Sequence, residues 1–236
     1  MGRIFAIAFA LFAFCAPVRK EGRVIAAHHS AMRTSWPTPQ FVGVNLVGSS
    51  VQNNGGILSG FTTSSYATMP FYWTSGALQI EAVVKFHWNG TNSTNSGIWG
   101  CVGSKDAFTP FYYETVNVDH MFGAYLSSNG TSWAINTSNG HWSIQNPPAG
   151  DYVLKLAWSE GTVKLYRWTG SAWVLDMTAS IASIYGESNL VPQLGTNRGQ
   201  SYPLNGTIDL NYTYLVRDGA LFWEGAAGAF KNVARL

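Results

Sequence analysis

Apolar and polar side chains alternate along much of the chain after residue 40, and this alternation predicts β-strands. In Gln79–Trp88, every second residue from Ile80 onward is apolar, and the residues between them include Glu81 and Lys85. Successive side chains of a strand point to opposite faces of the sheet, so the apolar face of this segment is expected in the core.

Three further segments alternate in the same way and are separated by short glycine-containing turns: residues 152–158, 162–168 and 173–175. Three-residue loops with glycine are typical of β-hairpins, so these segments predict a meander. The turn Arg217-Asp218-Gly219 predicts another hairpin, between residues 212–216 and 220–223. Apart from one short turn at residues 181–185, no window shows helical periodicity. The pattern therefore predicts an all-β fold, either a sandwich or a closed barrel.

The composition supports this fold class and restricts the function. Charged residues make up 11% of the chain and aromatic residues 14%, which suits half-buried strands better than surface helices. Residues 1–40 hold five basic residues and one acidic residue, so the remainder has nine of the 14 basic and eleven of the 12 acidic residues. A body with this balance is not expected to bind nucleic acid. Two cysteines, Cys15 and Cys101, are too few for a disulfide framework, and Cys101 is expected to be buried.

The first forty residues differ from the body. Residues 4–16 form an almost unbroken apolar run that follows Arg3 and precedes Arg19. The run is too short to span a bilayer, which takes about 20 residues. It fits the core of a cleaved signal peptide or an anchor buried in a larger assembly, and both alternatives remain open. We expect a hydrophobic leader and extended connector over residues 1–40 and the folded domain over residues 41–236.

Several segments between residues 45 and 225 share a pattern: Gly60-Phe61-Thr62-Thr63-Ser64-Ser65-Tyr66, the meander around Glu160-Gly161, Leu194-Gly195-Thr196, Pro203-Leu204-Asn205-Gly206-Thr207-Ile208-Asp209-Leu210, Asp218-Gly219 and Phe222-Trp223. Together they resemble the concanavalin A-like lectin/glucanase (laminin-G-like) jelly-roll domain, of the kind found in bacteriophage tail fibre and virion proteins. The resemblance implies an antiparallel two-sheet jelly-roll sandwich. It implies no particular ligand, because fold does not fix function.

The carboxylates that the glycoside hydrolases of this fold use do not occur in the expected pattern. Those enzymes place two glutamates and an aspartate on alternate residues of one strand, and retaining hydrolysis needs two carboxyl groups about 5 Å apart. Glu81 is alone on its strand, and no Glu-x-Asp-x-x-Glu run occurs. Glu114, followed by Asp119 and His120, forms the only local acid–histidine cluster. We therefore expect that the protein is not an enzyme.

Aromatic and polar residues around the expected loops predict a carbohydrate-binding site. Proteins hold sugars through aromatic faces and a few fixed polar groups. The candidates are Trp99, Tyr112, Tyr113, Asp119, His120, His141 and Trp142. Packing in the core is the alternative role for these rings, and we expect it for more than half of them.

Calcium is the one cofactor that the resemblance implies. Related domains often hold this ion at a loop rim through aspartate and asparagine oxygens, which here would be those of Asp106, Asn117 and Asp119. Oxygen ligands of this kind suit Ca²⁺, although the chain has no acid-dense loop like that of an EF-hand.

These observations favour a non-enzymatic virion structural or adhesion protein, a fibre, spike or decoration subunit that presents a lectin-like jelly-roll to glycans on a host surface. Such a protein is expected to be a homo-oligomer, for instance a trimer, and to contact other virion subunits through residues 1–40. The alternative is a secreted, extracellular carbohydrate-binding protein whose leader is removed as a signal peptide.

Overall fold

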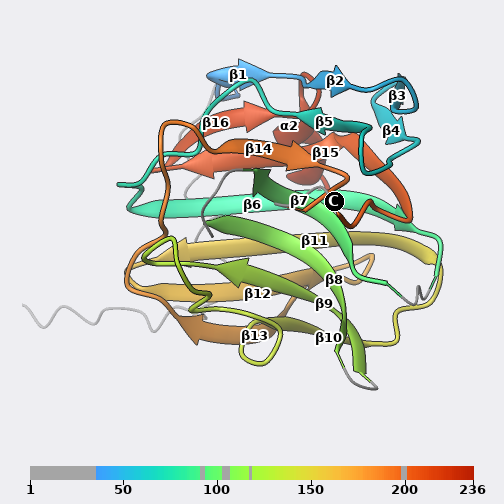
Figure 1. Cartoon of the computed structure of the whole chain (residues 1–236). Helices are drawn as coiled ribbons and strands as arrows, with labels where there is room; N and C mark the ends of the chain where they lie inside the picture. The colour runs from blue at the N-terminus through green and yellow to red at the C-terminus, as the bar shows by residue number, and fades with distance from the viewer. Residues whose placement is uncertain (1–35, 91–93, 103–106, 117–118, 198–200) are drawn as a thin grey trace, which may run out of the picture. The chain divides into compact units, whose positions relative to one another are not determined.

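A computed structural model describes residues 36–90, 94–102, 107–116, 119–197 and 201–236. Residues 37–236 form one compact unit, in which two β-sheets lie against each other (Figure 1). This arrangement confirms the predicted all-β, two-sheet sandwich. The predicted leader and nearly all of the connector lie outside the described residues.

The larger sheet has nine strands in this part of the chain. Its spatial order is β1 (Phe41–Val42), β16 (Ala220–Glu224), β15 (Gly206–Arg217), β6 (Gln79–Trp88), β11 (Gly150–Ser159), β12 (Thr162–Trp168) and β13 (Trp173–Ser180), with β4 (Ile57–Ser59) paired to β15 and β3 (Gln52–Asn54) paired to β4. Every pairing is antiparallel except β1 with β16, which is parallel. The predicted antiparallel pairing therefore fails only for this two-residue edge strand.

The smaller sheet has seven strands. Its spatial order is β10 (His141–Gln145), β9 (Asp119–Leu126), β8 (Phe108–Val116), β7 (Ser96–Val102), β14 (Val191–Leu194), β5 (Tyr66–Thr68) and β2 (Asn45–Val47). β8 and β9 form a long hairpin towards one side of this sheet, in which Phe108 pairs with Leu126 and Val116 with Asp119. This hairpin positions the site described below.

The meander and the C-terminal hairpin are confirmed, but two of their turns are shorter than the predicted three residues, and the turn between β12 and β13 is longer, since Trp168 pairs with Trp173 across residues 169–172. Ser159 pairs with Thr162, so β11 and β12 are joined by the two residues Glu160 and Gly161, at φ values of 50° and 78°. β15 and β16 are joined in the same way by Asp218 and Gly219, at 53° and 77°. Two consecutive left-handed residues make a turn whose twist matches the strands, and this explains why two residues suffice.

A short helix that the sequence pattern did not predict packs on the outer face of the larger sheet. Helix α2 (Ala229–Val233) buries Phe230 and Val233 against Val83 of β6 and Tyr214 of β15. Its five residues are too few to show a 3.6-residue period, which explains why the pattern missed it. Residues 181–185, where a helical turn was expected, are irregular. In the ranges that the structure describes, no helix is long and apolar enough to cross a membrane.

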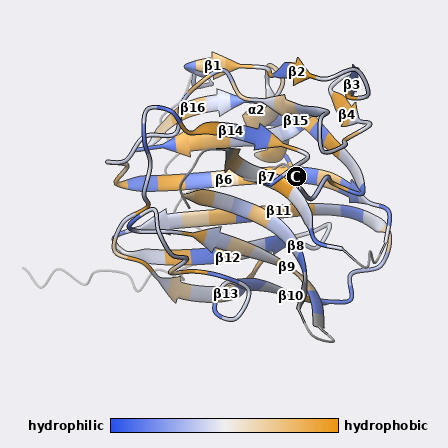
Figure 2. Cartoon of the chain, in the orientation of Figure 1, coloured by the Kyte–Doolittle hydropathy of each residue, from blue (hydrophilic) through white to orange (hydrophobic). Residues whose placement is uncertain are grey.

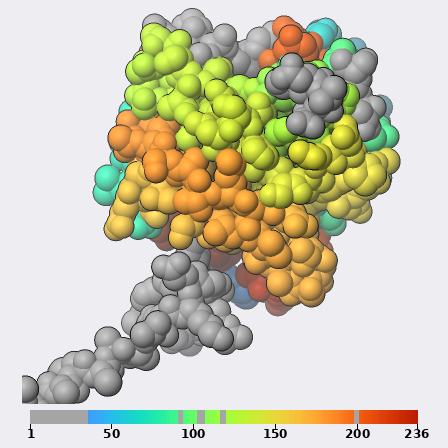
Figure 3. Space-filling view, turned by 90° about the horizontal axis from the view of Figure 1, so that it is seen from below, coloured from blue at the N-terminus to red at the C-terminus, as the bar shows by residue number. Residues whose placement is uncertain are grey.

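The alternation of hydropathy along the strands is visible in Figure 2, where orange and blue positions follow one another along β6 and β11. The segment between β9 and β10 leaves the sheet as a loop over residues 127–140, the yellow-green surface in Figure 3. It lies beside the segment after β13, since the Tyr185 amide donates to the Ser127 carbonyl at 2.8 Å. The loop is thus fixed to the body at its start.

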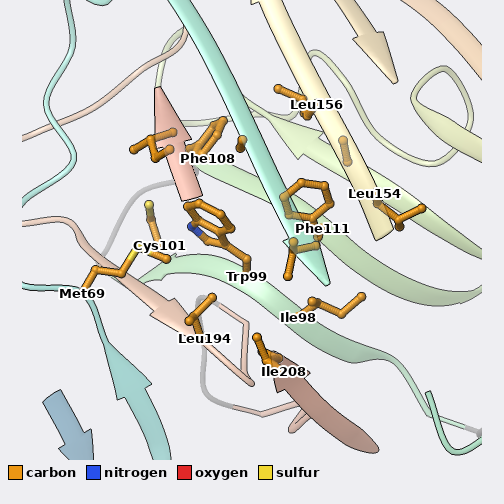
Figure 4. Packing of buried hydrophobic residues seen from close by; sticks show 14 of the residues in the cluster. Met69, Ile98, Trp99, Cys101, Phe108, Phe111, Leu154, Leu156, Leu194 and Ile208 are labelled. Atoms are coloured by element: carbon orange, nitrogen blue, oxygen red, sulfur yellow. The ribbon is translucent and has the colours of Figure 1, made fainter. Parts of the chain in front are cut away.

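Aromatic side chains dominate the core between the sheets. Trp73, Trp88, Trp99, Trp142 and Trp223 are all at most 1% exposed. Figure 4 shows Trp99 among Met69, Cys101, Phe108 and Leu194. Cys101 is 2% exposed, which confirms its predicted burial. Removal from water raises the pKa of its thiol well above the ordinary range, so Cys101 is a packing residue.

Candidate functional site

A hollow of about 190 Å³ lies on the outer face of the smaller sheet. Its lining is Thr109, Tyr112 and Glu114 from β8, Tyr125 from β9, Trp133 from the following loop, and Asn197 beyond β14. The volume is below the 300–1,000 Å³ typical of sites for drug-sized ligands. It suits one small group or one sugar unit.

A bulge in β8 brings the lining residues to one face. The pairing of β8 with β9 shifts register between Thr109 and Tyr112. An extra residue in one strand reverses which side chains face outward beyond it. Phe108 and Phe111 therefore point into the core, whereas Thr109, Tyr112 and Glu114 line the hollow.

The ring of Tyr125 meets those of Tyr112 and Trp133 nearly at right angles at the hollow. The rings of Tyr112 and Tyr125 are 5.3 Å apart between centroids, with an interplanar angle of 79°. The rings of Tyr125 and Trp133 have the same separation and angle. Edge-to-face contacts of this kind stabilise the aromatic cluster itself and hold its ring faces in fixed directions.

The carboxylate of Glu114 is held at the bottom of this cluster. Its Oε2 atom accepts hydrogen bonds from the Tyr125 hydroxyl and the Thr137 hydroxyl. Gly123 allows this approach, because a Cβ atom there would lie 2.5 Å from Cγ2 of Thr137. The loop can thus pack directly on β9, and it places Thr137 within reach of Glu114.

Local side-chain hydrogen bonds stiffen the loop that carries Trp133. Ser127 Oγ accepts from the Gly130 amide at 2.9 Å, and Asn129 Oδ1 accepts from the amides of Thr131 and Ser132 at 2.9 and 3.1 Å. Turns closed by asparagine and serine side chains in this way hold the backbone in one conformation. A preordered loop loses little entropy when a ligand binds.

The two tyrosines of the site are neutral over the physiological range. Burial raises the pKa of Tyr112 above its ordinary value, although a hydrogen bond with Asn95 opposes the shift. Burial also raises the pKa of Tyr125, and its hydrogen bond to Glu114 adds to the shift. Both phenols therefore keep their hydroxyl protons and can act as hydrogen-bond donors.

The free energy of unfolding is expected to fall as the pH rises above about 10, the ordinary tyrosine pKa. A phenol whose pKa is raised by folding stabilises the protein fully below the unfolded-state pKa, and that contribution is lost as the pH rises towards the folded-state pKa. Each such tyrosine steepens the fall of the unfolding free energy with pH by at most about 1.4 kcal/mol per pH unit. Urea unfolding at several alkaline pH values measures it, and Tyr125→Phe should make the slope shallower. An unchanged slope in that variant would contradict the statement that folding raises the pKa of Tyr125.

Only part of the candidate set predicted from the sequence lies at this hollow. Tyr112 lines it. Trp99, Tyr113 and Trp142 are fully buried in the core and expose no ring face on which a sugar could stack. The Trp142 indole nitrogen donates to the Tyr166 carbonyl at 2.9 Å, as a buried indole requires. These three rings are packing residues in this structure.

The two candidate histidines do not line the hollow. His141 pairs with Gly123, and its Nδ1 is 2.8 Å from the Thr137 carbonyl oxygen, so it supports the loop. The His120 ring packs edge-on against Tyr113 at 6.0 Å. Asp119 pairs with Val116 at the end of the hairpin, and its side chain lies outside the described residues.

The predicted calcium site stays a prediction. Asp106 and Asn117 lie outside the described residues, as does the side chain of Asp119. Across the described ranges, no group of three or more histidine, cysteine, aspartate or glutamate side chains is placed to hold a metal ion.

The sequence pattern missed most of the lining. Glu114 belongs to the acid–histidine cluster of the sequence, whereas Thr109, Tyr125, Trp133 and Asn197 are not among the predicted residues. Tyr125 shares the outer face with Thr109 because the two pair in the β8–β9 hairpin, and no local sequence pattern shows that pairing.

A second hollow, of about 640 Å³, lies at the β2–β5 edge. Phe41, Phe71 and Phe222 gather there with centroids 4.9 to 5.6 Å apart. Tyr72 stands beside them and is 58% exposed. The described lining of this second hollow is largely apolar and contains no charged side chain.

No protein-family model matches this chain, and no curated protein matches its sequence. Solved structures match it in fold. Domain 4 of AbnA, an extracellular GH43 arabinanase from Geobacillus stearothermophilus solved in complex with arabinotriose, is 16% identical, with a TM-score of 0.47 over 79% of this chain and 82% of that one. A SAP-like pentraxin from Limulus polyphemus is 14% identical, with a TM-score of 0.42 over 76% and 77%.

The enzymatically active domain of tailspike protein 2 from bacteriophage CBA120 is 10% identical, with a TM-score of 0.46 over 81% of this chain and 30% of that one. Likenesses at this level carry no argument about what this chain binds.

Proposed function

We propose that this chain is a non-catalytic glycan-binding module that holds a sugar unit in the hollow between β8, β9 and the 127–140 loop. The observation that carries the proposal is the set of three fixed rings, Tyr112, Tyr125 and Trp133, around the carboxylate of Glu114. Aromatic faces pack against the C–H surfaces of a sugar, and a few fixed polar groups orient its hydroxyls. Asn197 adds an amide to the same lining.

Binding fits this site better than hydrolysis does. Glycoside hydrolases of both stereochemical classes need a second carboxyl group, at about 5 Å from the first for retention and about 6.5–9.5 Å for inversion. Glu114 is the single carboxylate among the described residues that line the hollow. Its Oε2 atom is already engaged by two hydroxyl donors, which suits a positioning carboxylate.

We further propose that the module belongs to the concanavalin A-like jelly-rolls and serves adhesion as part of a virion. The two-sheet architecture supports this assignment, as do the C-terminal segments of the resemblance, residues 203–210, Asp218-Gly219 and Phe222-Trp223, which lie in and around β15 and β16. A secreted lectin is the alternative, and it makes the same use of the hollow. The intact mass of the native protein separates the two, because a secreted lectin would lack its leader.

The test of the proposed binding is a glycan array probed with the full chain. The proposal expects a small set of related glycans to give signal, and it expects Trp133→Ala to remove that signal. If folded protein gives no signal with any glycan on the array, the proposed glycan binding is wrong. Release of reducing ends from a bound polysaccharide would instead show an enzyme.

A further inference from the structure

The hollow carries negative charge that no described residue neutralises. Glu114 is the only charged side chain in the described lining. The ion pairs found within the described ranges involve Lys85, His87, Arg167 and Arg217, and none of them includes Glu114. Hydrogen bonds from two neutral hydroxyls fix the carboxylate but leave its charge in place.

The rings around Glu114 favour a cation as well. The face of an aromatic ring is electron-rich, and a cation within about 6 Å of its centroid is attracted to it. The Tyr125 ring is nearly perpendicular to the rings of Tyr112 and Trp133, and all three rings line one small space. Several aromatic faces with a carboxylate form the type of cage that binds ammonium groups.

The same chain places lysine ammonium groups over aromatic faces elsewhere. The ammonium group of Lys155 lies 4.8 Å from the ring centroid of Tyr166 and 4.4 Å from that of Trp173. Lys85 lies 4.2 Å from the Tyr212 centroid and pairs with Asp209 at 3.0 Å. At those two places the chain supplies its own cation. The hollow at Glu114 has the rings and the carboxylate, and no described lysine or arginine lines it.

We propose that the ligand unit seated in this hollow carries an ammonium group, and that on a glycan this unit is an amino sugar with a free amine. The inference rests on the proposed glycan-binding function and specifies its ligand. The ammonium group would lie among the three rings and donate hydrogen bonds to Glu114, while the sugar ring would pack on Trp133. Acidic sugars are disfavoured, because their carboxylates would face that of Glu114.

Isothermal titration calorimetry on the full chain tests this with matched probes. The probes are an oligomer of glucosamine with free amines, the N-acetylated oligomer of equal length, and choline chloride, at a pH where the amines are protonated. We expect the free-amine oligomer to bind at least tenfold more tightly than the acetylated one. Glu114→Gln should reduce that ratio to about twofold, because it weakens binding of the free-amine oligomer more than binding of the acetylated one. This variant keeps the oxygen that accepts from Tyr125 and Thr137, so it should fold.

Equal binding of the free-amine and acetylated oligomers would overturn the inference and leave glycan binding intact. A preference for free amines that survives Glu114→Gln would overturn it as well. Binding of choline alone, lost in Glu114→Gln, would support the ammonium site and assign it to a quaternary ammonium headgroup instead of a sugar. If neither oligomer nor choline binds, the inference is wrong. Glycan binding itself is then judged by the array, on which neutral glycans are also displayed.

Discussion

Replacing Trp133 with alanine is expected to weaken glycan binding by about thirtyfold, since truncating an aromatic anchor at the centre of a site costs about 2 kcal/mol. Trp133 is partly exposed on the 127–140 loop and lines the hollow against Tyr125. The loop is closed by its own hydrogen bonds, so removal of this ring leaves its backbone supported. Affinity for the best array glycan, measured by calorimetry, gives the result.

Tyr72→Ala is the matched control for this change. Tyr72 is an exposed aromatic residue, but it lines the other hollow, at the β2–β5 edge. The control should bind the glycan as the unmodified protein does. If Tyr72→Ala loses affinity and Trp133→Ala keeps it, the ligand occupies the second hollow and the site has been assigned wrongly.

Replacing Trp99 with alanine is expected to destabilise the fold by about 3–5 kcal/mol, the usual cost of truncating a large core aromatic residue. Trp99 is fully buried on β7 and packs against Phe111 and Trp223 with ring centroids 5.8 and 5.5 Å away. Urea unfolding followed by tryptophan fluorescence measures the change. The reason for the large effect is the cavity left between the two sheets.

Trp99→Phe keeps this prediction testable if the alanine variant does not fold. It should lose less stability and bind the glycan with unchanged affinity, since Trp99 has no exposed surface at which to meet a ligand. If Trp99→Phe loses glycan affinity without losing stability, Trp99 is part of the binding site and this prediction is wrong.

Alternation along the sequence predicted six strands of the larger sheet and none of the strands described in the smaller one. β6 was predicted with the bounds that it has, because every second residue from Ile80 to Trp88 is apolar and these five residues face the core. The meander and the last hairpin were also predicted, since each of their turns contains a glycine, which has a positive φ in the structure. Parallel pairing of β1 with β16 was not, because it joins residues about 180 positions apart and leaves no local signal.

The site was predicted poorly for two physical reasons. Aromatic residues serve both cores and binding sites, so residue type alone did not separate buried Trp99, Tyr113 and Trp142 from Tyr112. The bulge in β8 then breaks the period of two, which makes Tyr112 rather than Phe111 face outward with Glu114. Trp133 lies in a loop, where no period exists to show which way a side chain points.

The most direct test of the central claim is to locate a bound glycan by NMR titration of the full chain with the best array ligand. The account predicts that the largest chemical-shift changes fall on the indole N–H of Trp133 and on amides of residues 109–114 and 123–137. Changes confined to the amides around Thr68 and Tyr72, or none at saturating ligand, would contradict it.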